Sequence, residues 1–251
     1  MRKSKVSVKK LFVFCATALL LTAVTGASAS AAGSISEIVT TLFGESTQTI
    51  DIVILLTVLT LLPSIVIMMT GFTRIVIVLS FIRNALGMQQ TPPNQVIIGL
   101  ALFLTLFVMA PVVTAVYEDA YIPYTNGEIE QAEFFDRAMA PTREFMLKQT
   151  EPSDLNFFMG LSGEEYATPE ELPNTVLIPA FMTSEIKLAF KIGFFIFIPF
   201  IVVDMVVAST LMAMGMMMLP PAMISLPFKV LLFVFVDGWQ MIIGTLVQSF
   251  G

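Results

Sequence analysis

The chain has 251 residues, of which 56% are hydrophobic, only 13% are charged and none is His. This composition excludes an ordinary soluble domain and indicates an all-α, membrane-associated protein. The formal net charge is −6, and five of the 13 basic residues lie within the first ten positions. Binding to nucleic acid is disfavoured for the rest of the chain, because no basic stripe remains there to neutralise phosphates.

Residues 1–31 have the pattern of a cleavable secretory signal peptide. Five basic residues precede an apolar run from Leu11 to Val24, and small residues follow it. Two overlapping Ala-x-Ala sites place the end of the signal at 29 or 31, which leaves 32–49 as the mature N-terminal segment. Cleavage would leave 8 basic and 19 acidic residues, a net charge of −11. The alternative is an uncleaved anchor, although the apolar run is short for a membrane span.

A first helical hairpin is predicted over residues 50–116. Its first apolar block, from Ile52 to Ile82, would be about 46 Å long as one helix, whereas the hydrocarbon core of a bilayer is about 30 Å thick. The block must therefore tilt or break, and the expected interruptions are Pro63, Gly71 and Arg74.

The second block of this hairpin, from Gln95 to Val116, is uncharged and has the length of one span, with Pro111 near its end. Thr91-Pro92-Pro93-Asn94 separates the two blocks as a stop and restart signal. Hydropathy alone thus predicts two crossings here and two more in the second half of the chain.

Residues 117–185 form an acidic region, which we expect to be an aqueous domain on the periplasmic side. It holds fourteen acidic residues against three basic ones. Such a charge excess is most simply a solvated face, so no ligand is assigned to it.

A second helical hairpin is predicted over 186–251, with a methionine-containing loop (the Met loop, residues 215–221) between its two apolar blocks. Gly215, Pro220 and Pro221 shape this loop, because they keep it from continuing either helix. Flexible, polarizable methionine side chains could seal an irregular opening and repack after something has passed, and those of the loop are Met216, Met217 and Met218. The alternative is an ordinary apolar cluster or a tight turn between two membrane helices.

Arg74, Asp204 and Asp237 lie in apolar blocks, where an ionisable group is a candidate for function or for a buried polar contact. The two aspartates each stand sixteen residues from the Pro220–Pro221 bond, so a hairpin folded there would bring their carboxylates level. If they faced each other without water, one would hold a proton, as a proton-coupled transporter would require. The alternative is that they face different neighbours or a wet lumen.

Lys229 needs a counter-charge from another segment or from another copy of the chain. Glu185 is the first candidate, because it also stands alone among apolar residues. An intersubunit Glu185–Lys229 ion pair is therefore predicted, the alternative being a lysine that reaches lipid headgroups.

The sequence lacks the residues of common catalytic and cofactor sites. It has no His, and its one cysteine, Cys15, lies within the predicted signal peptide. No phosphate-binding loop and no nucleophile turn are present. We therefore expect neither an enzyme nor a cofactor.

Three long motifs resemble the FliP family of flagellar type III export-gate proteins. The first runs from Arg74 to Gly87 and continues through Gln95, and the second runs from Pro179 to Phe194. The third extends from Asp204 through the Met loop to Trp239, so the resemblance covers nearly everything after residue 50.

The resemblance implies a pore component rather than an enzyme. Family members assemble as a homopentamer joined by FliQ and FliR, near FlhB and FlhA, at the inner membrane. Unfolded flagellar subunits pass through the resulting ring-shaped helical gate. By resemblance, Met216, Met217 and Met218 form a gasket in the closed channel, and bent, kinked helical hairpins raised toward the periplasm replace four simple spans. The rival hypotheses are a proton-coupled small-solute transporter using Asp204 and Asp237, and a structural scaffold for another pore.

Overall fold

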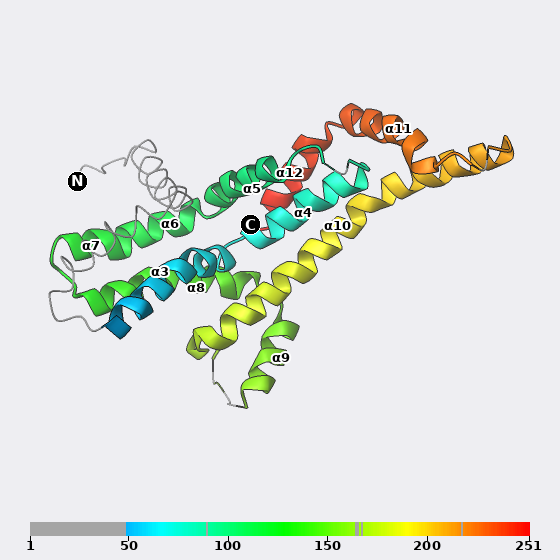
Figure 1. Ribbon diagram of the computed structural model, residues 1–251. Helices are drawn as coiled ribbons and strands as arrows, with labels where there is room; N and C mark the ends of the chain where they lie inside the picture. Colours follow the sequence, from blue (N-terminus) through cyan, green and yellow to red (C-terminus); the bar gives the residue numbers. More distant parts are fainter. Residues whose placement is uncertain (1–48, 89, 164–165, 167, 217) are drawn as a thin grey trace. The chain divides into compact units, whose positions relative to one another are not determined.

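The computed structural model describes residues 49–88, 90–163, 166, 168–216 and 218–251 (Figure 1). The predicted signal peptide and almost all of the segment 32–49 lie outside the described residues. All regular elements in the described part are helical, which confirms the predicted all-α class there. The chain divides into two compact units, Met1–Ile65 and Val66–Gly251. All contacts given below lie within the second unit.

The first apolar block is broken at Gly71. Helix α3 (Thr49–Met68) ends before it, and α4 (Phe72–Ala85) begins directly after it. Pro63 lies inside α3 and does not end that helix, whereas Arg74 falls in the first turn of α4. The predicted interruption is therefore confirmed at Gly71.

The second apolar block is not one straight span. Helix α5 (Asn94–Val108) and helix α6 (Ala110–Val116) meet at Met109, and the axis bends by 57° there. Pro111 lies in the first turn of α6, where its missing N–H cannot continue the hydrogen bonds of α5.

Helical structure continues from this block into the acidic region. A π-helical turn, η2 (Tyr117–Tyr121), leads to α7 (Ile122–Thr125). Two longer helices, α8 (Gln131–Gln149) and α9 (Pro152–Ser162), follow, and a short 3-10 turn, η3 (Pro169–Glu171), precedes the next helix.

The longest helix is α10 (Asn174–Ala213), whose 40 residues extend about 60 Å. It runs without a break through the predicted domain boundary at 185/186 and contains both Pro179 and Pro199. It is the one described helix long and apolar enough to cross a membrane by itself. Counting each bent pair of helices as one span raises that number to four.

The core of the second unit lies where α4 packs against α10, which run side by side in Figure 1. The ring of Phe81 on α4 meets Phe190 and Phe197 of α10 edge-on, with ring centroids 5.2 and 5.8 Å away. Gly193 permits this approach, because a Cβ atom there would stand 2.5 Å from the Phe81 ring.

The chain after α10 turns back through α11 (Pro221–Phe235) and α12 (Gly238–Gln248), whose axes bend by 63°. Asp237 occupies the break with a left-handed backbone, at φ 47°. Helix α12 contributes Ile242 and Leu246 to the same core that holds α4 and α10.

Candidate functional site

The Met loop is an exposed apolar tip at the α10 end of the hairpin. Gly215, at φ +75°, ends α10, and the Met216 N–H returns to the Leu211 carbonyl at 3.0 Å. Met216 is 48% exposed and Met218 is 98% exposed, while Met217 lies outside the described residues. Pro220 caps α11 and Pro221 begins it, as their fixed φ favours. Gly215, Pro220 and Pro221 thus lie at the two ends of the loop, and their loop-shaping roles stay a prediction.

A polar cluster lies below the tip, between α10 and α11. The Lys229 Nζ contacts Asp204 Oδ2 at 2.6 Å and the Ala85 carbonyl at 3.3 Å. The Ser225 hydroxyl donates to Asp204 Oδ1 at 2.5 Å. Lys229 is only 5% exposed, so its charge is neutralised inside the chain by the neighbouring helix.

This register differs from the one in which Asp204 and Asp237 would come level, and it agrees with the alternative that they face different neighbours. Helix α10 ends at Ala213 and α11 begins at Pro221, so the chain reverses over the whole connecting segment rather than at the Pro220–Pro221 bond alone. Asp204 therefore lies opposite Ser225 and Lys229. Asp237 lies beyond α11, at the start of α12, and is exposed.

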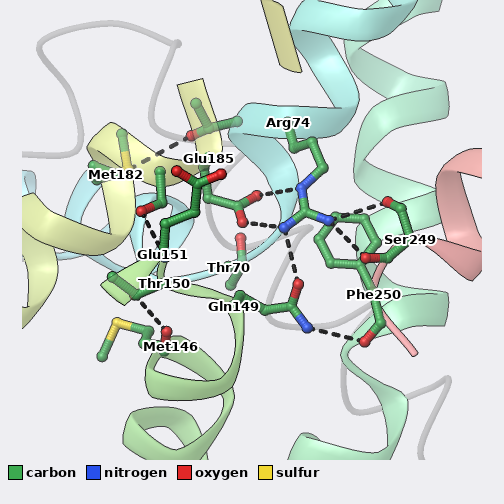
Figure 2. Close-up of polar contacts among 12 residues, drawn as sticks. Thr70, Arg74, Met146, Gln149, Thr150, Glu151, Met182, Glu185, Ser249 and Phe250 are labelled. Carbon is green, nitrogen blue, oxygen red and sulfur yellow. Dashed lines mark hydrogen bonds and ion pairs between the residues drawn. The ribbon is translucent and has the colours of Figure 1, made fainter. Parts of the chain in front are cut away.

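A second polar cluster, which we call the Arg74 junction, joins three helices and the residues after α12 through one buried guanidinium (Figure 2). The Arg74 Nε donates to Glu185 Oε2 at 2.9 Å, and its Nη2 pairs with Glu185 Oε1. Both side chains are fully buried. A buried pair of this geometry compensates two charges that would be costly to bury alone.

The remaining donors of Arg74 hold segments that are distant in sequence. Its Nη2 also donates to Gln149 Oε1 at 2.9 Å, and its Nη1 donates to the Ser249 carbonyl and hydroxyl at 3.0 Å each. The Gln149 amide in turn donates to the Phe250 carbonyl at 3.0 Å. The Arg74 guanidinium also lies over the Phe250 ring, 3.8 Å from its centroid. The junction thus connects α4, α8, α10 and the residues after α12 (Figure 2).

Glu185 and Lys229 therefore each have a partner within their own chain. An ion pair between copies stays a prediction, since the structure holds one copy. The sequence marked Arg74 and Glu185 separately as isolated charges but did not pair them. It gave no signal for Gln149, Ser249 or Phe250, whose contacts join positions 75 to 175 residues apart.

A third polar cluster fastens α9 to α10. Asp154 accepts from Lys187 Nζ at 2.8 Å and from the Ser184 hydroxyl at 2.7 Å. Burial acts to raise the pKa of Asp154, but the hydrogen bonds from Lys187 and Ser184 and the Lys187 charge outweigh it and lower the pKa below its ordinary 3.8. Among the described residues, no group of three His, Cys, Asp or Glu side chains could hold a metal ion.

One long apolar helix, bent apolar helix pairs and charges paired between helices define a membrane protein built from helical hairpins. The chain belongs to the FliP family, whose pattern matches residues 55–246. The flagellar biosynthetic protein FliP of Pectobacterium carotovorum is 56% identical over 209 residues, covering 82% of this chain and 81% of the relative.

Two other relatives extend this similarity. The flagellar biosynthetic protein FliP of Bacillus subtilis is 53% identical, covering 81% of this chain and 92% of the relative. That of Caulobacter vibrioides is 48% identical and covers 96% of this chain and 91% of its own length. The resemblance and the prediction of a non-enzymatic protein are confirmed by this membership.

Proposed function

We propose that the chain is a core pore component of the flagellar type III protein export gate, through which unfolded flagellar subunits cross the inner membrane. The Met loop acts in it as a deformable gasket. The observation that carries this proposal is the exposure of the loop: Met218 projects from the chain almost completely bare of contacts. An apolar side chain in that position gains stability only when something outside the chain covers it.

The apolar surface of the hairpins supports assembly into a ring. Only 11% of the most apolar stretch of α10 is buried within the chain. Phe194, Phe195 and Met205 of α10 and Phe235 of α11 are among the exposed side chains. Neighbouring copies in a ring of five would cover this surface, together with FliQ and FliR. FlhB and FlhA would lie nearby, at the inner membrane and on the periplasmic side of the flagellar base.

In such a ring, each copy contributes one Met loop to a common axis. Unbranched thioether side chains fill an irregular gap and exclude water, yet they repack at low cost when an extended polypeptide enters. The fixed ends of the loop, at Gly215 and Pro220–Pro221, limit how far it can retreat.

The contacts of Asp204 support this reading over a proton-coupled transporter. Both of its carboxylate oxygens are engaged, one by Lys229 and one by Ser225. Asp237 stands apart from this cluster, so the two aspartates do not form the carboxylate pair that would share a proton. Asp204 instead fixes the hairpin that carries the loop.

The test replaces Met216, Met217 and Met218 together by Ala in cells that express the chain with its partners. We expect the gate to assemble and ions to leak across the inner membrane, measured as loss of membrane potential or uptake of a small ionic dye. The matched control replaces Met205 and Met241 by Ala, because both are exposed but lie outside the loop. A normal potential in the triple variant would contradict the gasket.

A further inference from the structure

Helix α12 is attached loosely along its length. It buries only Gly238, Ile242 and Leu246. An apolar cleft of about 520 Å³ separates it from α10, lined by residues such as Phe195, Phe200 and Ile242. Side chains that face a void forfeit their contacts on that side, so packing along the helix supplies less than its apolar composition suggests.

The end of α12 is held much more tightly. Ser249 accepts two hydrogen bonds from Arg74, and Phe250 accepts one from Gln149. The Phe250 ring is buried against the Arg74 guanidinium and stacks on Phe145, with ring centroids 6.3 Å apart. We call Ser249 and Phe250 the latch segment. Figure 2 shows both residues beside Arg74 and Gln149.

The other end of α12 meets α11 at a break, where the helix axis bends by 63°. Asp237 adopts a left-handed backbone there, at φ 47°, and its side chain makes no capping hydrogen bond. Gly238 follows, and its missing Cβ makes room for the Phe233 ring. Helix α11, which begins at the Met loop, is therefore held from two sides: by Lys229, which contacts Asp204 and the Ala85 carbonyl, and by α12 across this break.

We propose that Arg74 and Gln149 are positioning residues for the gate: by holding the latch segment they fix α12, and through the break at Asp237 they set, together with the contacts of Lys229, the direction of α11 and its Met loop. The importance of that direction for export rests on the proposed function. The link from the latch segment through α12 to α11 does not rest on it. Glu185 enables the arrangement, because its carboxylate allows the Arg74 charge to be buried.

Gly71→Ala tests the latch without removing any polar group. Gly71 has φ −68°, which alanine adopts without strain, but an added Cβ would stand 2.6 Å from the Phe250 ring. The ring must shift away from Gly71. Gly244→Ala, on α12 itself, is the matched control, because a Cβ there meets nothing within 4 Å.

The readout is the distance between spin labels at positions 103 on α5 and 223 on α11, both exposed. The full chain is used in its assembled complex, with Cys15 replaced by Ser and labelled copies diluted by unlabelled ones. We expect a displaced second peak in Gly71→Ala and an unchanged distribution in Gly244→Ala. Phe250→Ala gives the same displaced peak, and combining it with Gly71→Ala adds no further shift.

Gln149→Leu removes only the amide contacts. It gives a second peak at the same distance as in Phe250→Ala, but with a smaller population. An unchanged distribution in Phe250→Ala overturns the proposal. Ion leakage is recorded on the same variants, so the two proposals can fail separately. If the latch variants show the displaced peak but the Met-loop variants do not leak ions, the gasket is refuted and the latch is supported. If the Met-loop variants leak ions but the latch variants leave α11 unmoved, the latch is refuted and the gasket is supported.

Discussion

Arg74 is the residue on which the polar contacts of the junction converge, and within the described part of the chain Glu185 is the charged side chain that pairs with it. We expect Glu185→Gln to lower the free energy of unfolding by about 3–5 kcal/mol, because it leaves a buried guanidinium without a counter-charge. The measurement is chemical unfolding of the solubilised complex.

Gln149 supplies the rescue, since its Oε1 accepts from the same Nη2 atom that pairs with Glu185. Adding Gln149→Glu to Glu185→Gln returns one carboxylate to the junction and should recover much of the loss. Glu133→Gln is the control. Its i,i+4 pair with Arg137 is about half exposed, and we expect a change of at most about 0.5 kcal/mol. Equal losses in Glu133→Gln and Glu185→Gln would contradict the role of burial.

Single residues were partly predictable from the sequence. A charge in an apolar block is noticeable by itself, so Arg74, Glu185, Asp204 and Lys229 were all identified as candidates. Their pairing was not predictable, because Arg74 and Glu185 are 111 positions apart and periodicity carries no information about which helices meet. For Asp204, the partner depended on where the hairpin reverses, and the reversal is spread over the residues between Ala213 and Pro221 rather than centred on the proline pair.

At the scale of elements, α9 is docked on α10 by a carboxylate that can be protonated. The folded-state pKa of Asp154 is lowered below 3.8, so its ion pair stabilises docking above that value. The contribution is lost as the pH falls through the lowered pKa. We expect amide hydrogen exchange in α9, corrected for the intrinsic rate, to accelerate only in that acid range.

Asp154→Asn should show the faster exchange at neutral pH and lose the acid step. The exposed Asp136 on α8 provides the comparison, and Asp136→Asn should leave the exchange of α9 unchanged. An acid step that persists in Asp154→Asn would assign it to another group.

The sequence predicted which helices exist better than it predicted the residues at which they begin and end. Gly71 was identified as a break because it lies inside an apolar block too long for one span. The start of α10 was missed by more than ten residues, since Glu185 and Lys187 make its first turns look like part of the acidic domain. Those charges are paired with Arg74 and Asp154, which allows one helix to carry both characters. Composition cannot show such pairing.

At the scale of the whole molecule, the open question is whether charges pair within one copy or between copies. Since Lys229 contacts Asp204 of its own chain, we expect exchanging the two residues, as Asp204→Lys with Lys229→Asp, to restore assembly that either single change impairs. The measurement is recovery of the intact complex by size-exclusion chromatography.

The competing exchange, Glu185→Lys with Lys229→Glu, should restore nothing, because it breaks two internal pairs at once. Recovery by this second pair alone would show that the predicted intersubunit contact forms in the assembly. Ring size and partners could be expected only from family resemblance. The structure of a single chain shows which of its surfaces are apolar, but it does not show what covers them.

The unbroken length of α10 makes it a lever arm. From Glu185 to Ala213 it spans 28 residues, or about 42 Å. A tilt of about five degrees around the Arg74 anchor would carry the far end about 4 Å sideways, comparable to the width of an extended backbone. Because the anchor lies this far from the Met loop, small adjustments beside Arg74 become movements of several ångströms at the loop.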